Sequence, residues 1–164
     1  MLLREAIPNC GDGFGCELLN PVEAAAGETA NWSELRWGPN RTTQNVFYLH
    51  GTLPLFDTGA DIIKEQYTED DYLLQNIAHR FDARQYPVFV TAGNGQDKLN
   101  QIRHNSYLSD CYDNFSILDG SLVVFGFNFG QYDEHIIDAI NKAAVFGSKQ
   151  PPKLWSIYYS DTQI

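Results

Sequence analysis

Short apolar runs that alternate with helical patterns constrain the fold of this 164-residue chain more than any other feature. Four runs predict strands, at 46–50, 88–91, 121–130 and 154–160. They are continuously apolar rather than alternating, which is typical of strands covered on both faces. Strands that alternate with helices predict βαβ units. We therefore expect an α/β domain over 1–164, a Rossmann-like three-layer fold with a mostly parallel sheet, in which 1–45 form an irregular amino-terminal segment.

Helical periodicity fills the spaces between these runs. Leu73, Ile77 and Phe81 recur on one helical face, and Thr68 followed by three acidic residues predicts the start of that helix. A second helix is expected from about Asp97, and a third has an apolar face of Ile136, Ile140, Ala143 and Ala144. A short strand is also expected near 61–66, after a turn at Asp57–Gly59.

The formal net charge of −10 limits the partners of the chain. Such a field repels a phosphate backbone, so nucleic-acid binding is not expected. A single nucleotide remains compatible, because a helix amino terminus can hold a pyrophosphate locally. No apolar run approaches the ~20 residues that span a bilayer, and the first residues lack a signal-peptide pattern. We expect a cytoplasmic protein.

Cysteine and histidine spacing predicts neither a disulfide framework nor a metal site. The three cysteines are Cys10, Cys16 and Cys111, without a C-x-x-C pair, which agrees with a reducing compartment. No two of the four histidines lie four residues apart, so a helical metal pair is absent. No metal cofactor is expected.

Three polar turns follow predicted strands, at His50–Gly51, Gly93–Gly95 and Gly126–Asn128. Ligands of parallel sheets bind beyond the carboxyl ends of the strands, so these turns predict a binding site. His50 can be structural or can accept a proton, since an unperturbed imidazole pKa of ~6.5 suits proton transfer near neutral pH. The glycine beside it permits close approach of a ligand to the backbone.

The loop after the third run leads into a predicted helix. Asp133 could cap that helix or bind a ribose hydroxyl. Asn128 could turn the chain or contact a ligand. His135, in the first helical turn, is expected to be exposed to solvent.

The segments YLHGTLPLF, PVFVTAGN and SLVVFGFNFGQYDEHI, in that order, resemble the sirtuin-like NAD-binding domains of bacteria, in an uncharacterised branch whose members are about twice as long. The last segment is similar to the G-[YF]-S-x-x-D-x-x-I of sirtuin-like antiphage defence proteins. The resemblance implies that NAD is a substrate, that nicotinamide is released, and that His50 is the general base. It also implies that Gly51, Gly126, Phe127, Asn128 and Asp133 contact NAD. The four-cysteine zinc module of deacetylases has no counterpart here.

Two other motifs of that group, a glycine-rich phosphate loop and T-x-N-x-D, do not occur in the chain. The resemblance then implies that this chain is the carboxyl-terminal half of such a domain, and that its sheet is incomplete at the amino-terminal side. An incomplete sheet leaves an open edge and apolar surface. We therefore expect self-association or an upstream half-domain partner, and no turnover by this chain alone. The alternative is a non-catalytic interaction or structural α/β module.

Overall fold

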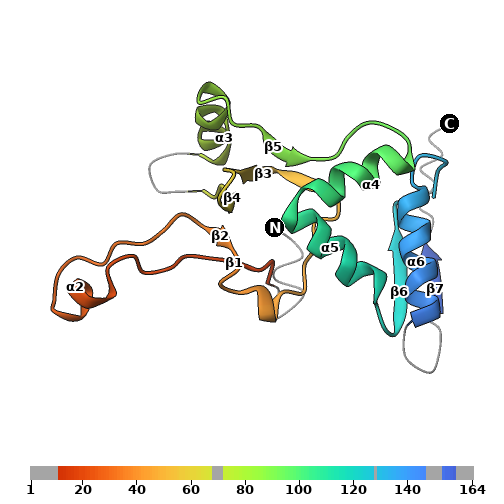
Figure 1. The fold of residues 1–164 in the computed structure, drawn as a ribbon, viewed down its shortest axis with the longest axis horizontal. Coiled ribbons are helices and arrows are strands. Elements are labelled where there is room, and N and C mark those ends of the chain that lie inside the picture. The colour runs from red at the N-terminus through yellow and green to blue at the C-terminus, as the bar shows by residue number, and fades with distance from the viewer. Residues whose placement is uncertain (1–10, 68–71, 128, 147–152, 158–164) are drawn as a thin grey trace. The chain divides into compact units, whose positions relative to one another are not determined.

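The computed structural model describes residues 11–67, 72–127, 129–146 and 153–157, and the chain divides into two compact units, Met1–Phe89 and Val90–Ile164 (Figure 1). Each unit has its own secondary structure and its own buried residues. None of the helices in the described ranges is long and apolar enough to cross a membrane.

The first unit is built on a five-stranded sheet with strand order β1-β2-β4-β3-β5, in which every neighbouring pair is antiparallel. The strands are β1 (Phe14–Gly15), β2 (Arg36–Trp37), β3 (Gly51–Asp57), β4 (Ile62–Lys64) and β5 (Pro87–Phe89). The helical segments among its described residues are α2 (Pro21–Ala25), the 3-10 helix η1 (Arg41–Thr43) and α3 (Leu73–Asp82).

A tight turn and one apolar cluster organise this sheet. Between β3 and β4 the Thr58 N–H donates to the Asp61 carbonyl oxygen at 3.0 Å, and Gly59 takes φ +84°, which suits glycine. The hairpin and α3 then bury Phe56, Ile63 and Ile77 together. The predicted helical face therefore packs at Leu73 and Ile77, whereas Phe81, its third member, is 42% exposed. The predicted helix start at 68–71 lies outside the described residues.

The main sheet is antiparallel, so the prediction of a Rossmann-like fold with a mostly parallel sheet is wrong. The physical reason lies in the connections. A helix of ten or more residues allows a parallel crossover, whereas the short turn after β3 can only return the chain antiparallel. β3 is followed by a hairpin strand, and β5 pairs with β3 antiparallel even though α3 precedes it.

The predicted strand at 46–50 is also displaced. Val46–Tyr48 have no strand structure, and β3 begins at Gly51. Pro54 argues against a strand at 51–57 in the sequence, because proline has no N–H to donate to a ladder hydrogen bond. The register between β3 and β5 shifts between Gly51 and Phe56, and Pro54 occupies that irregular stretch. A bulge of this kind is where a strand tolerates proline.

The second unit contains the one parallel pairing between described strands. β6 (Ser121–Phe125) pairs with β7 (Lys153–Ile157), and α6 (Glu134–Phe146) connects them. Residues 158–160 of the predicted last strand lie outside the described residues. α4 (Gly95–His104) and α5 (Ser106–Ser116) contact α6 and each other. The buried residues of the three helices include Ile102, Tyr107, Leu108, Cys111, Tyr112, Ile136, Ala139 and Ala143.

Candidate functional site

His50, the predicted catalytic base, lies in a turn immediately before β3 rather than after a strand. The turn is closed by the Gly51 N–H, which donates to the Tyr48 carbonyl oxygen at 2.9 Å. The His50 side chain is half-buried. The prediction that His50 lies at the carboxyl end of a strand is therefore wrong. Its role as a base then depends on the resemblance alone.

Gly51 has a structural explanation that needs no ligand. Its φ is +74°, and a Cβ atom added there would lie 1.9 Å from the carbonyl oxygen of Val88 in β5. Only glycine permits this approach, because β3 and β5 meet at the register pair Gly51↔Phe89. The glycine beside His50 is thus required by the sheet.

Three of the remaining predicted site residues lie together around the loop from β6 to α6, in the second unit. Gly126 follows β6 with φ +68°, and a Cβ added there would meet nothing within 4 Å. The rings of Phe127 and Phe129 pack edge to face with centroids 4.9 Å apart. Asn128 lies outside the described residues. The loop therefore combines a left-handed glycine, open space beside it and a compact aromatic pair.

Asp133 immediately precedes α6, and its carboxylate forms an ion pair across the unit. Its Oδ1 lies 2.9 Å from Lys98 Nζ of α4, and the two side chains are 18% and 13% exposed. The Ile136 N–H donates to the Asp133 carbonyl oxygen, as expected at a helix start. Lys98 therefore neutralises the carboxylate that sequence considerations assigned to a cap or to a ribose.

The beginnings of α4 and α6 are packed against each other. A Cβ added at Gly95 would lie 2.9 Å from Glu134 Cβ and 3.3 Å from the His135 backbone nitrogen. Asn94 caps α4: its Oδ1 accepts from the Asp97 N–H at 3.0 Å, while Asp97 Oδ2 accepts from the Asn94 N–H at 3.1 Å. The Asn94 side chain therefore caps α4, which gives this residue of the predicted polar turn a structural role.

His135 is buried, with 1% exposure, so the expectation that it faces solvent is wrong. The helix start that carries it is covered by α5: the hydroxyl of the fully buried Tyr112 donates to the His135 carbonyl oxygen at 2.8 Å. Burial raises the pKa of Tyr112, although the nearby Arg103 opposes the shift. Tyr112 is thus a neutral hydrogen-bond donor that holds α5 against α6.

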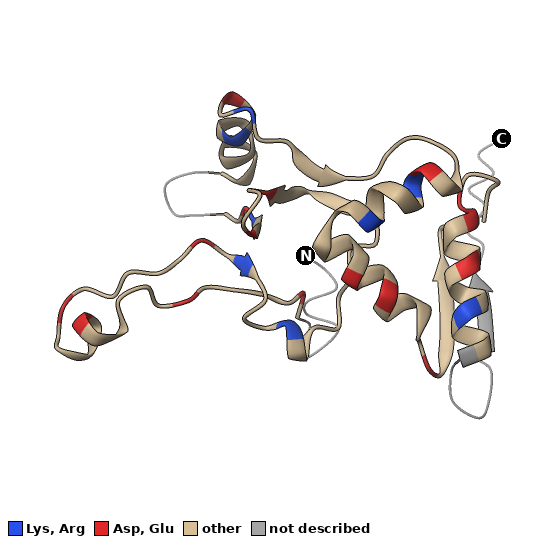
Figure 2. Ribbon diagram, in the orientation of Figure 1, with Lys and Arg blue, Asp and Glu red and all other residues tan. Residues whose placement is uncertain are grey.

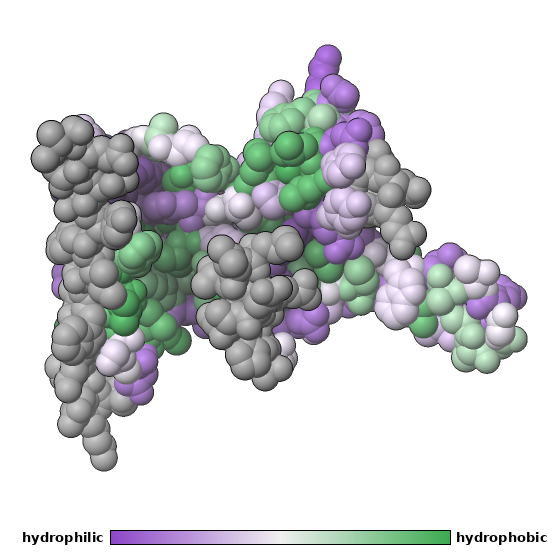
Figure 3. All heavy atoms as spheres, turned by 180° about the vertical axis from the view of Figure 1, so that it is seen from behind, coloured by the Kyte–Doolittle hydropathy of each residue, from purple (hydrophilic) through white to green (hydrophobic). Residues whose placement is uncertain are grey.

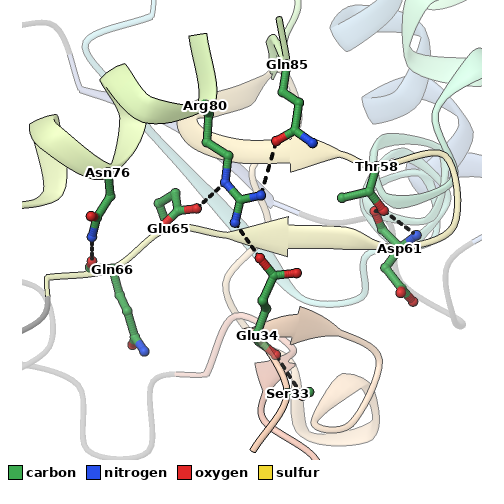
Figure 4. Close-up of polar contacts among 9 residues, drawn as sticks. All are labelled: Ser33, Glu34, Thr58, Asp61, Glu65, Gln66, Asn76, Arg80 and Gln85. Atoms are coloured by element: carbon green, nitrogen blue, oxygen red, sulfur yellow. Dashed lines mark hydrogen bonds and ion pairs between the residues drawn. The ribbon is translucent and has the colours of Figure 1, made fainter. Parts of the chain in front are cut away.

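A separate polar cluster in the first unit surrounds Arg80 of α3 (Figure 4). Its guanidinium contacts Glu34 and Glu65 at 2.5 Å each and Gln85 at 3.1 Å. Burial lowers the pKa of Arg80, but the hydrogen bonds and charges of the two glutamates outweigh it and leave the pKa raised. This guanidinium links three segments of the unit and is already engaged, so the cluster is structural.

Sequence considerations missed Lys98, whereas Gly95 belongs to the predicted polar turn Gly93–Gly95. The sequence Asn94–Gly95–Gln96–Asp97 has the spacing of a capping box and marks the start of α4. No local pattern indicates that Lys98 pairs with Asp133. Within the described ranges, no group of three or more histidine, cysteine or acidic side chains could hold a metal ion. Cys16 is exposed and Cys111 is buried.

Comparison with known protein families gives one result. The family described as a domain of unknown function (DUF4917) matches residues 17–150, most of the chain. The chain belongs to this family. The DUF4917 match includes every predicted site residue, from His50 to Asp133. No curated protein and no solved structure matches the chain.

Proposed function

We propose that this DUF4917 domain binds a dinucleotide, NAD by resemblance, at the loop between β6 and α6. The observation that carries the proposal is the β6–α6–β7 unit, a parallel pair whose first strand runs through a left-handed glycine into a helix amino terminus. Ligands of parallel strands bind at this end, where helix N–H groups favour anions.

The charges around the loop fit a nucleotide better than free phosphate. Lys98 neutralises Asp133, while Glu134 is exposed in the first turn of α6. A carboxylate at the start of α6 can accept a hydrogen bond from a ribose hydroxyl, and the backbone N–H groups there can bind the pyrophosphate. We expect modest affinity, because Lys98 is already paired with Asp133 and the exposed Glu134 adds a negative charge.

Hydrolysis of NAD is the reaction that the resemblance implies, with His50 as the general base. His50 and Gly51 belong to the first unit, and Gly126, Phe127 and Asp133 belong to the second. The phosphate loop and T-x-N-x-D are missing from this sequence. We therefore propose binding without turnover for this chain alone, and catalysis only when those motifs are supplied.

Calorimetric titration with NAD tests the binding, with nicotinamide release followed in parallel. Gly126→Val should weaken NAD binding at least about tenfold, because the side chain occupies the open space that the ligand needs and strains a left-handed residue. Gly120→Val is the matched control, since Gly120 also has a positive φ, +99°, and nothing within 4 Å of an added Cβ. Equal NAD affinity in both variants, or no binding by the wild type, would refute the site.

His50→Ala tests the catalytic role separately, in a protein extended to include the missing motifs. The proposal expects loss of nicotinamide release with unchanged NAD affinity. Full turnover without the His50 imidazole would end its assignment as the base, whatever the binding result.

A second candidate, a non-catalytic interaction module, is favoured by the open face of β6. Val123 is 59% and Phe125 is 72% exposed, and both lie on the same face because strand side chains alternate. Parallel sheets are ordinarily covered on both faces. Self-association through this face would cover it, and Phe125→Ser should then shift sedimentation toward the monomer. A wild-type monomer at all concentrations would contradict this candidate.

A further inference from the structure

A long excursion joins β1 to β2, and we define residues 17–35 as the arm. Its two sides run antiparallel, with a bridge between Leu18 and Trp32 and a hydrogen bond from the Leu19 N–H to the Asn31 carbonyl oxygen at 2.7 Å. The Asn20 side chain braces the tip: it donates to the Thr29 carbonyl oxygen at 2.9 Å and accepts from the Asn31 N–H at 2.7 Å. The arm therefore has a defined shape, with α2 at its end (Figure 1).

The arm has no core of its own. Ser33 is the one buried residue within it, and α2 buries none. A helix of five residues is not stable in isolation, and connections longer than about 12–15 residues inside a domain are commonly functional. Its large apolar side chains are nevertheless exposed: Leu19 by 58%, Val22 by 76% and Trp32 by 61%. Tryptophan is a residue type that dominates interface energetics.

The charge of the arm has one sign. It contains Glu17, Glu23, Glu28 and Glu34 and no lysine or arginine, and Figure 2 shows red segments along it up to the blue of β2. All four glutamates are exposed, and Glu34 pairs with Arg80. In Figure 3 green and purple residues alternate on the projecting lobe that the arm forms. Apolar and anionic groups thus share one surface.

A second copy of the chain is a poor occupant for this surface. The net charge is −10, and several of its cations are engaged in ion pairs, as in Lys64–Asp12, Arg80–Glu65, Lys98–Asp133 and Arg103–Asp113. Bringing two such chains together would add like charge to the interface, which costs affinity. Charge complementarity requires a cationic partner.

We propose that the arm is a docking element for a different protein, which it binds through an amphipathic helix of that protein whose apolar face is flanked by lysine and arginine. Trp32 and Val22 pack against the apolar face of this helix. Glu23 and Glu28 face the flanking cations, accelerate association and restrict the choice of partner. All four side chains are exposed, and none belongs to the buried core of the first unit.

An amphipathic helical peptide of leucine and lysine, fluorescently labelled, serves as the probe. Its anisotropy is titrated with the full chain, and a leucine–glutamate peptide is the charge-reversed probe. We expect binding of the lysine peptide alone. Trp32→Ala should weaken it about tenfold or more, the size of a hot-spot loss. Glu23→Gln combined with Glu28→Gln should weaken it and flatten its salt dependence.

Asp82→Asn combined with Asp138→Asn is the matched control, because both residues are exposed and lie outside the arm. This pair should leave peptide affinity unchanged, and all variants should melt as the wild type does. The proposal is overturned if the wild type fails to bind, if the control pair reproduces the arm pair, or if Trp32→Ala binds normally. It is equally overturned if sedimentation shows a dimer that Trp32→Ala dissociates, since the occupant is then a second copy.

Discussion

Substitution of Gly51 by alanine gives the sharpest test of how the first unit is built. The new Cβ would lie 1.9 Å from the Val88 carbonyl oxygen, in a residue with φ +74°. An alanine in the left-handed region costs ~1–2 kcal/mol. Relief of the clash requires β3 to separate from β5, and overpacking of this kind costs about 1–3 kcal/mol more. We expect a loss of about 3 kcal/mol in the free energy of unfolding.

Gly59→Ala is the matched control, because Gly59 also has a positive φ, +84°, and nothing lies within 4 Å of an added Cβ. The two variants share the backbone strain and the change in unfolded-state entropy. Their difference therefore measures the clash, about 2 kcal/mol. Urea titration followed by tryptophan fluorescence measures both, in a Trp155→Phe background so that the signal comes from Trp32 and Trp37 of the first unit.

Equal destabilisation by the two substitutions would refute the close approach of β3 and β5 at Gly51. The result also bears on the histidine beside it. Gly51→Ala would disturb the sheet directly beside His50, so a loss of NAD turnover in that variant of the extended protein carries no information on the role of the His50 imidazole. Only substitution of the imidazole itself tests the proposed base.

The remaining predictions concern contacts inside each unit. Tyr112→Phe should cost about 1–2 kcal/mol at neutral pH by leaving the His135 carbonyl oxygen without this donor. Because its pKa is raised on folding, Tyr112 stabilises below about pH 10 and that contribution is lost above it, so the gap between wild type and variant in urea titrations should narrow at higher pH. Arg80→Met should lower the free energy of unfolding by about 2 kcal/mol, because the carboxylate of Glu65, 14% exposed, loses its cationic partner. Adding Glu65→Gln to that variant should recover part of this loss. Gly95→Val should lower the thermal midpoint, because α4 and α6 would be forced apart.

The local parts of the fold were predictable from the sequence. Asp119–Gly120 before four apolar residues marked β6, and the periodicity through Ile77 marked the buried face of α3. Both signals depend on neighbours along the chain. Where a strong turn or a helical period is present, the backbone has few alternatives.

The direction of strand pairing was not predictable from the same patterns. A run of apolar residues indicates burial but does not specify which strand lies beside it. The apolar run before His50 predicts the strand, whereas the strand observed, β3, begins at Gly51 and includes Pro54. Both residues are depleted in strands in general, and here the close approach to Val88 and the bulge accommodate them.

The candidate site was predictable only in part, for a related reason. Gly126 and Asp133 stood out because a glycine after a strand and an acid before a helix have recognisable local roles. Lys98 did not, because its meeting with Asp133 results from the packing of α4 on α6. Trp32 carried no periodic signal, and its exposure follows from the antiparallel arm that holds it.

The turn between β3 and β4 has a consequence for the time course of folding. It joins residues adjacent in sequence, so the hairpin can close with a small loss of chain entropy. The pairing of Arg36 in β2 with Ile63 must instead close a long loop, and the pairing of β5 with β3 must wait for the chain through α3 to be ordered. We therefore expect the hairpin to be the nucleus of the first unit, with β2 and the arm joining it last.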